Sequence, residues 1–447
     1  MDRSDYEYST LEVDDTQCLT QIKSNTRHDV PETQPGNSLP EAFPSDAPEV
    51  IDGREGARPR RSMLCGLRRK TFWVALATGV TLIAISIAVG IGVGVTSQKN
   101  SNSSSTAPPS PSPSPSGNVA SFSRLAAANY TDRQKAEHTL VYYQDDALNL
   151  WMADLDLTKN AWTQSQVNTT GYKPKNGTPI AAINIKIQAR VDLHIRFVSE
   201  TNYIRALFLD RLNNRDWRIA HKPDSVWSVT DESNLGDYYA QCDGCDSTGF
   251  MIFQSDHTHK TAFAYPYNDF SFNNSIPDGI VPDLGTAYAL APIQAIEELG
   301  DTHGYAGIYL SVDQALREFY FATGHGVKVT NVNLTMTVDA GAQIAAMSYA
   351  QNGLRYVQVL VTRETGGVQM AYLDGGPAQD WTWTDVVGGM EEVVPLSPIS
   401  ATPVGRVYAL EEGENGRRRI VEFNRTSSTG IPKFERLGPI NITAVST

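Results

Sequence analysis

A small-residue strand that recurs about every 55 residues constrains the fold of this chain more than any other feature. Its form is (I/L)-A-A-x-x-x, as in IAAINI and IAAMSY. Copies begin at Leu125, Ile180, Tyr288, Ile344, Ile399 and Ile442. The second and third starts are 108 residues apart, which is two periods and predicts a degenerate copy near Leu235–Ala240. A fixed period of this length indicates a repeat architecture.

Each repeat also holds a β-branched and aromatic strand, followed by a turn and a further strand. These aromatic strands are Val141–Tyr143, Ile195–Phe197, Met251–Phe253, Ile308–Leu310, Val357–Val361 and Arg406–Tyr408. A large aromatic residue often comes next, at Trp162, Trp217, Trp381 and Phe434. Six such units, each with about four short strands, predict an all-β fold, a six-bladed β-propeller over residues 119–447. A pair of β-sandwiches is the alternative.

The small residues of the recurring strand suit the innermost position of a blade. Blades converge there on a narrow channel, and large side chains would collide. The last segment, NITAVST, is expected to add a strand that closes the ring. No long segment has the apolar periodicity of a helix, which argues against a parallel βαβ fold.

The part of the chain before the repeats divides into three segments. Residues 1–71 are polar and predict a disordered cytoplasmic tail. Residues 72–95 hold no charged residue across 24 positions, and a helix of that length spans about 36 Å, enough to cross a membrane as a transmembrane helix. Residues 96–118 are rich in Ser and Pro and predict an extended stalk.

The residues beside the apolar span set its orientation. Before it lie Arg58, Arg60, Arg61, Arg68, Arg69 and Lys70, whereas only Lys99 follows closely. The positive-inside rule therefore predicts a single-pass type II membrane protein, with its C-terminal domain extracellular or lumenal. Gly90 and Gly94 form a GxxxG pair that favours a homodimer through the helix.

Sites for N-linked glycans give an independent indication of this topology. Sequons occur at Asn102, Asn129, Asn168, Asn176, Asn273, Asn333, Asn424 and Asn441. All of them follow the apolar span, as expected for a glycoprotein whose C-terminal domain enters the secretory lumen.

The repeated strands resemble those of the fungal fucose-specific lectins, which are six-bladed propellers. The resemblance covers about residues 120–447 and rests on IAAMSYA, LVYYQDD, RVYALEE and ALREFYF. It implies a fungal protein that binds fucose, or fucosylated glycans, in clefts between adjacent blades. In that family an Arg of the RVY strand and a Glu of the IRE strand bind the sugar hydroxyls. An aromatic ring packs on the apolar face of the sugar.

Carried over repeat by repeat, the resemblance gives four carbohydrate-binding residues. The sixth repeat keeps Arg406 and Glu422. The fourth keeps Glu318 but has Ala306 or Gly307 in place of the Arg, and Tyr349 matches the aromatic position. The remaining repeats depart from the pattern, with Leu140 and Met152, His194 and Ala206, Phe250 and Ala262, and Gln358 and Met370. Three alternatives stay open: a structural ion pair for Arg406 and Glu422, a solvated strand residue for Glu318, and core packing for Tyr349.

Cys242 and Cys245 form a C-x-x-C motif in the predicted lumenal domain. Thiols oxidise in that compartment, so a disulfide is expected. A redox dithiol, or a zinc site completed by His257 and His259, is the alternative.

Several functional classes find no support in the sequence. A net charge of −13 argues against nucleic acid as a partner. There is no sialidase-type box, no G-x-S-x-G elbow and no phosphate-binding loop, so neither an enzyme nor a cofactor is expected. Two hypotheses remain. One is a membrane-anchored lectin-like propeller, and the other is a propeller without sugar binding that serves as a protein-interaction or structural module.

The topology can be checked on the native protein. Treatment with an endoglycosidase that removes N-linked glycans is expected to increase its electrophoretic mobility, because every sequon follows the apolar span. Unchanged mobility would contradict the proposed orientation.

Overall fold

The computed structural model describes the region that carries the repeats. Described are residues 118–187, 190–210, 216–220, 227–239, 249–264, 271–272, 281–296, 304–322, 326–329, 334, 336–375, 380–427, 430–440 and 443–444. The predicted tail, transmembrane helix and stalk up to residue 117 lie outside them, as do Cys242 and Cys245. Within the described residues no helix is long and apolar enough to cross a membrane.

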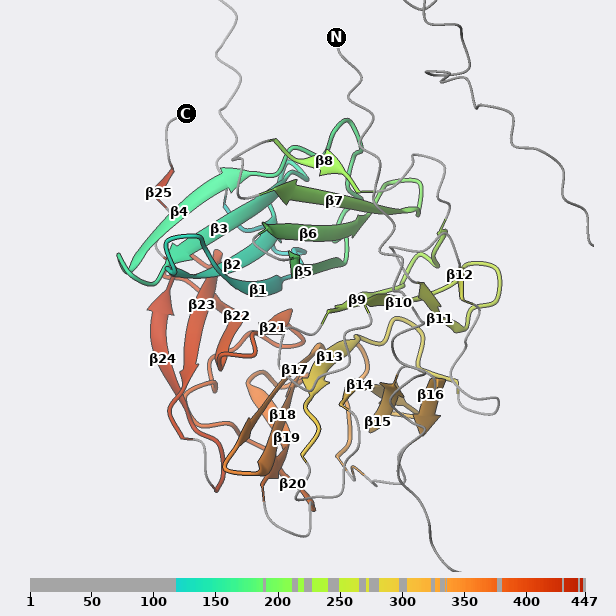
Figure 1. Ribbon diagram of the computed structural model, residues 1–447, viewed down its shortest axis with the longest axis vertical. Helices are drawn as coiled ribbons and strands as arrows, with labels where there is room; N and C mark the ends of the chain where they lie inside the picture. The colour runs from blue at the N-terminus through green and yellow to red at the C-terminus, as the bar shows by residue number, and fades with distance from the viewer. Residues whose placement is uncertain are drawn as a thin grey trace, which may run out of the picture. The chain divides into compact units, whose positions relative to one another are not determined.

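Strands in this region form six sheets, and each sheet is one blade of a propeller (Figure 1). Blade 1 contains β1 (Ala126–Thr131), β2 (Glu137–Gln144), β3 (Leu150–Asp156), β4 (Ala161–Gln166) and β25 (Thr443–Ala444). Blade 2 contains β5 (Ile180–Ile187), β6 (Arg190–Val198), β7 (Ile204–Asp210) and β8 (Arg218–Ile219). Blade 3 contains β9 (Leu235–Tyr238), β10 (Phe250–Gln254), β11 (Thr261–Ala264) and β12 (Ser271–Phe272).

The other three blades have the same order of strands. Blade 4 contains β13 (Ala289–Ile293), β14 (Tyr305–Val312), β15 (Ala315–Ala322) and β16 (Gly326–Val329). Blade 5 contains β17 (Ile344–Gln351), β18 (Leu354–Thr362), β19 (Val368–Asp374) and β20 (Trp381–Thr384). Blade 6 contains β21 (Ile399–Ala401), β22 (Arg406–Glu412), β23 (Arg418–Arg425) and β24 (Phe434–Pro439). The predicted six-bladed propeller is therefore confirmed.

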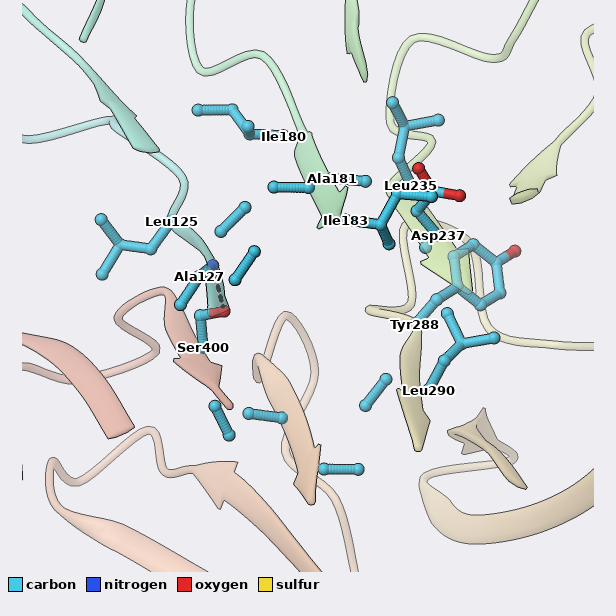
Figure 2. A pocket seen from close by; sticks show the side chains of 18 of the residues that line it. Leu125, Ala127, Ile180, Ala181, Ile183, Leu235, Asp237, Tyr288, Leu290 and Ser400 are labelled. Atoms are coloured by element: carbon cyan, nitrogen blue, oxygen red, sulfur yellow. Dashed lines mark hydrogen bonds between the residues drawn. The ribbon is translucent and has the colours of Figure 1, made fainter. Parts of the chain in front are cut away.

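The recurring small-residue strand is the innermost strand of each blade. Strands β1, β5, β9, β13, β17 and β21 follow one another around the ring and line a central cavity of about 420 Å³ (Figure 2). The degenerate copy predicted near Leu235–Ala240 is β9. The copy that begins at Ile442 behaves differently, because β25 pairs in parallel with β4 at the outer edge of blade 1. The segment from Ile442 resembles an inner strand in sequence but does not form one. The extra strand that the sequence predicts for this segment is present.

A hydroxyl group fixes the start of most inner strands. Thr178, two residues before β5, accepts a hydrogen bond from the Val198 amide through Oγ1 at 2.8 Å and donates to the Val198 carbonyl at 2.8 Å. Ser123, Ser233, Thr286 and Ser397 accept the corresponding amide bond in blades 1, 3, 4 and 6. The bond ties the loop that enters each blade to its second strand.

Blade 5 reaches the same result with a different residue. Ala342 stands where the hydroxyl residue stands elsewhere, and Thr362 supplies the oxygen from the second strand instead. The Gln343 amide donates to Thr362 Oγ1 at 2.9 Å, and the Thr362 amide donates to the Gln343 carbonyl at 3.0 Å.

A buried ion pair joins blades 2 and 3. Arg196 of β6 contacts Asp237 of β9 through Nη1 and Oδ2, and each side chain is 1% exposed. Removing one partner from a buried pair costs more than the pair contributes, because the remaining charge loses its compensation. The pair therefore fixes the packing of the two blades.

Replacing Asp237 with Ala is expected to lower the free energy of unfolding by about 3 to 5 kcal/mol. The double replacement of Arg196 and Asp237 by Met and Leu should cost less, since it removes both charges. Urea denaturation measures both effects. Asp385→Ala, at an exposed residue, is the control and should stay within about 0.5 kcal/mol. A single variant as stable as the control would contradict this role.

Candidate functional site

Arg406 and Glu422 meet in blade 6, as the sequence predicts. In the register of β22 and β23, Glu422 stands opposite Tyr408, and Arg406 lies two residues earlier on the same face. The Arg406 Nη1 atom pairs with Glu422 Oε1. The Arg406 side chain is 20% exposed and that of Glu422 is 8% exposed, so the guanidinium is the part of the pair that solvent reaches.

Tyr408 completes a three-residue group with this pair. Its hydroxyl donates to Glu422 Oε1 at 2.9 Å, and the ring is fully buried. Burial, and then the charge of Glu422, raise the pKa of Tyr408 far above its ordinary value. Both bonds to Glu422 use Oε1. Among the described residues no hydrogen bond uses Oε2, which leaves that oxygen for a ligand hydroxyl.

The group faces blade 1. Trp162 of β4 meets the ring of Tyr408 edge-on, with centroids 6.1 Å apart and an angle of 90°. Trp162 is partly exposed. Arg406, Glu422, Tyr408 and Trp162 are called the 6/1 site below.

Glu318 occupies the corresponding position in blade 4. It stands opposite Tyr309, whose hydroxyl donates to Glu318 Oε1 at 3.0 Å. Trp381 of blade 5 meets Tyr309 with ring centroids 6.0 Å apart. Gly307 stands two residues before Tyr309, as Arg406 stands two residues before Tyr408 in blade 6. Gly307, rather than Ala306, therefore occupies the position of the arginine.

Blade 5 brings an arginine toward the same group. Arg355 of β18 is buried, and its Cζ lies 5.4 Å from the ring centroid of Tyr305 in blade 4. Burial and the charge of Glu318 raise the pKa of Tyr309 well above its ordinary value, and the charge of Arg355 partly offsets them. Glu318, Tyr309, Trp381 and Arg355 are called the 4/5 site, in which the cation comes from the neighbouring blade.

Tyr349 is covered on both faces. Tyr356 stacks on it at 4.7 Å with an angle of 4°, and the Arg425 Cζ of blade 6 lies 3.9 Å from its centroid. Arg425 also donates to Gln358 Oε1 at 3.0 Å. A sugar ring could stack on Tyr349 only if Arg425 moved, so the structure places this residue apart from the two sites above.

The other blades lack the acid. Leu140 and Met152 in blade 1, and His194 and Ala206 in blade 2, stand where the sequence places them. In blade 3 the register puts Phe263, rather than Ala262, opposite Ile252, so the expected position was wrong by one residue. A single-residue shift along a strand moves a side chain to the other face of the sheet.

The sequons fall in different surroundings. Asn168 and Asn176 are exposed in loops, whereas Asn129 in β1 and Asn424 in β23 are partly or largely covered. Asn102, Asn273, Asn333 and Asn441 lie outside the described residues.

Sequence reasoning missed the tyrosine and tryptophan that complete each site. A signal was present, because Tyr408 follows Arg406 by two residues in RVY and a Trp recurs in the fourth strand of blades 1 and 5. Tyr142 of blade 1 and Trp217, which follows β7, make the same contact, with centroids 6.2 Å apart, but without an acidic residue.

Comparisons with known proteins agree at the level of the fold. No protein-family model and no curated protein matches the chain. Among solved structures, Aleuria aurantia lectin, a six-bladed β-propeller with a novel mode of fucose recognition, is 14% identical with a TM-score of 0.53, over 72% of this chain and 97% of the lectin. The SapL1 lectin in complex with α-methyl fucoside is 17% identical with a TM-score of 0.53, over 71% and 96%.

A third similar structure is AofleA from Arthrobotrys oligospora, which is 15% identical with a TM-score of 0.52, over 73% of this chain and 91% of that protein. The resemblance to fungal fucose-specific lectins that the repeats predict is thus confirmed as a shared six-bladed propeller fold.

The buried tyrosines predict how stability depends on pH. The pKa of Tyr408 is higher in the folded protein than its value of about 10 in the unfolded chain. The neutral side chain therefore stabilises the folded protein below pH ~10, and this stabilisation is lost as the pH rises further. Tyr408→Phe should therefore lose stability less steeply than the unmodified protein between pH 9 and 11. Thermal denaturation across this range tests it, and equal slopes would contradict it.

Proposed function

We propose that this protein is a lectin-like propeller that binds carbohydrate at the 6/1 site. The observation that carries the proposal is the Arg406–Glu422 pair, held against Tyr408 and facing Trp162 of the next blade. A lectin requires a pre-formed set of charged hydrogen-bonding groups beside an aromatic surface, and this site supplies both.

The chemistry of the pair suits two neighbouring sugar hydroxyls. The Arg406 guanidinium presents several N–H donors in a plane, and Glu422 presents Oε2 as an acceptor, so one ligand hydroxyl can be an acceptor and the next a donor. Tyr408 holds Glu422 in position through Oε1. The indole of Trp162 offers apolar area to the C–H face of a sugar. These groups bind a ligand, and no reaction is assigned to them.

Fucose is the sugar that we propose. Its support is the shared fold with Aleuria aurantia lectin and with SapL1, whose structure contains α-methyl fucoside, together with the Arg and Glu positions kept in blade 6. A membrane-anchored protein that presents this surface to glycans outside the cell or in the lumen is consistent with the apolar span and the placement of the sequons.

The 4/5 site is a second candidate for sugar binding. It repeats the buried Tyr–Glu bond and the facing Trp of the 6/1 site, with Arg355 in place of an arginine on its own blade. The remaining interfaces offer no equivalent acid among the described residues, so we propose at most two sugar sites. The alternative function, a protein-interaction module, follows if neither site binds sugar.

Binding of α-methyl fucoside to the purified full-length protein tests the proposal by calorimetry. Arg406→Ala and Glu422→Gln should each weaken binding at the 6/1 site about 10- to 100-fold, since hydrogen bonds to charged groups contribute about 1.5–3 kcal/mol. If the titration shows a second binding event at the 4/5 site, Glu318→Gln should remove it.

Arg417→Ala is the matched control, because Arg417 is exposed on the hairpin loop of blade 6 and should leave binding unchanged. No measurable binding of fucosides or of other glycans on an array would overturn the lectin proposal and favour the interaction module.

A further inference from the structure

The six inner strands enclose a cavity that the sugar sites do not use. Its volume of about 420 Å³ is within the range of small-molecule sites. The lining combines small apolar residues, among them Ala127 and Ala181 (Figure 2), with polar residues such as Asn184 and Asn234. The polar lining groups include Ser400, whose Oγ accepts the Ala127 amide at 2.8 Å.

One cation in this lining has no counter-charge among the described residues. Arg124 precedes β1 and lines the cavity. Arg196 and Arg406 each pair with a carboxylate, those of Asp237 and Glu422. Arg355 and Arg425 instead donate to a neutral oxygen, of the Gln294 carbonyl and the Gln358 amide. Among the described residues no ion pair or hydrogen bond involves the guanidinium of Arg124.

The nearby charges do not compensate Arg124 either. Asp237 also lines the cavity, but it is engaged by Arg196. Lys175 is a second cation close by, and its pKa is lowered, chiefly by burial and further by the charge of Arg124, although Asp231 and Glu232 partly offset this. Burial alone lowers the pKa of Arg124. The cavity lining thus includes a guanidinium that no carboxylate among the described residues compensates, and such a charge is costly without a partner.

We propose that the central cavity binds a small oxyanion, a phosphate or carboxylate group, on the guanidinium of Arg124. A guanidinium binds both groups through two parallel N–H···O bonds. The small apolar residues of the lining suit a short hydrocarbon portion of the ligand. This site is separate from the 6/1 and 4/5 sites, and its occupancy does not depend on sugar binding.

Calorimetric titration of the full-length protein with inorganic phosphate, and separately with acetate, tests the proposal. Ionic strength is kept constant with sodium chloride, so that a general salt effect is excluded. Saturable binding of either anion is expected, and the anion that binds identifies the group. Arg124→Gln should weaken this binding at least 10-fold, whereas Arg417→Gln, with the same loss of charge on an exposed loop, should leave it unchanged.

Arg124→Lys provides a second variant. It keeps the charge but not the two-bond geometry, so weaker binding than in the unmodified protein is expected, and circular dichroism shows whether each variant is folded. The proposal is overturned if neither anion binds saturably, if a folded Arg124→Gln or Arg124→Lys variant binds as the unmodified protein does, or if Arg417→Gln loses binding equally.

Discussion

Crowding between neighbouring inner strands is the constraint on which the rest of the structure depends. The clearest case is Gly236 in β9, where an added Cβ would lie 2.3 Å from Leu290 Cδ1 and 2.7 Å from Ile252 Cγ2. Blade 4 carries the larger Tyr288 and Leu290 in its part of the ring (Figure 2), so blade 3 gives up its side chain there. The sequence of β9 departs from the repeat because its small Gly236 makes room for the larger residues at the start of blade 4.

The inner strands determine where the outer chemistry stands. Each inner strand fixes the register of the second strand, and the hydroxyl bonds at their starts hold that register in place. Register then decides which face each side chain takes. In blades 4 and 6 this places a tyrosine and a glutamate opposite one another, directed at the tryptophan of the following blade. The same frame in blade 1 carries Met152 instead of the acid and is apolar.

The fold was largely predictable from the sequence, whereas the site was predictable only in part. Period and residue size are local properties, so the inner strands, the six blades and the Arg406–Glu422 pair follow from the pattern. Contacts between blades are not local. Nothing in the sequence around Tyr349 indicates that Arg425, from the next repeat, covers it. The charge of Arg355 likewise acts on Tyr309 across a blade boundary, and the Arg355 Cζ lies over the ring of Tyr305. Phe263 replaced Ala262 because a short strand leaves its register ambiguous.

The closure of the ring has a consequence for its integrity. Blades 1 and 6 come from opposite ends of the repeat sequence. A shared hydrophobic cluster, β25 beside β4, the Ala127–Ser400 bond, and the contact of Trp162 with Tyr408 hold them together. The proposed 6/1 site lies in this same seam. A ligand that contacts both blades there would stabilise their interface against separation. Recognition and the closure of the ring would then share Trp162 and Tyr408.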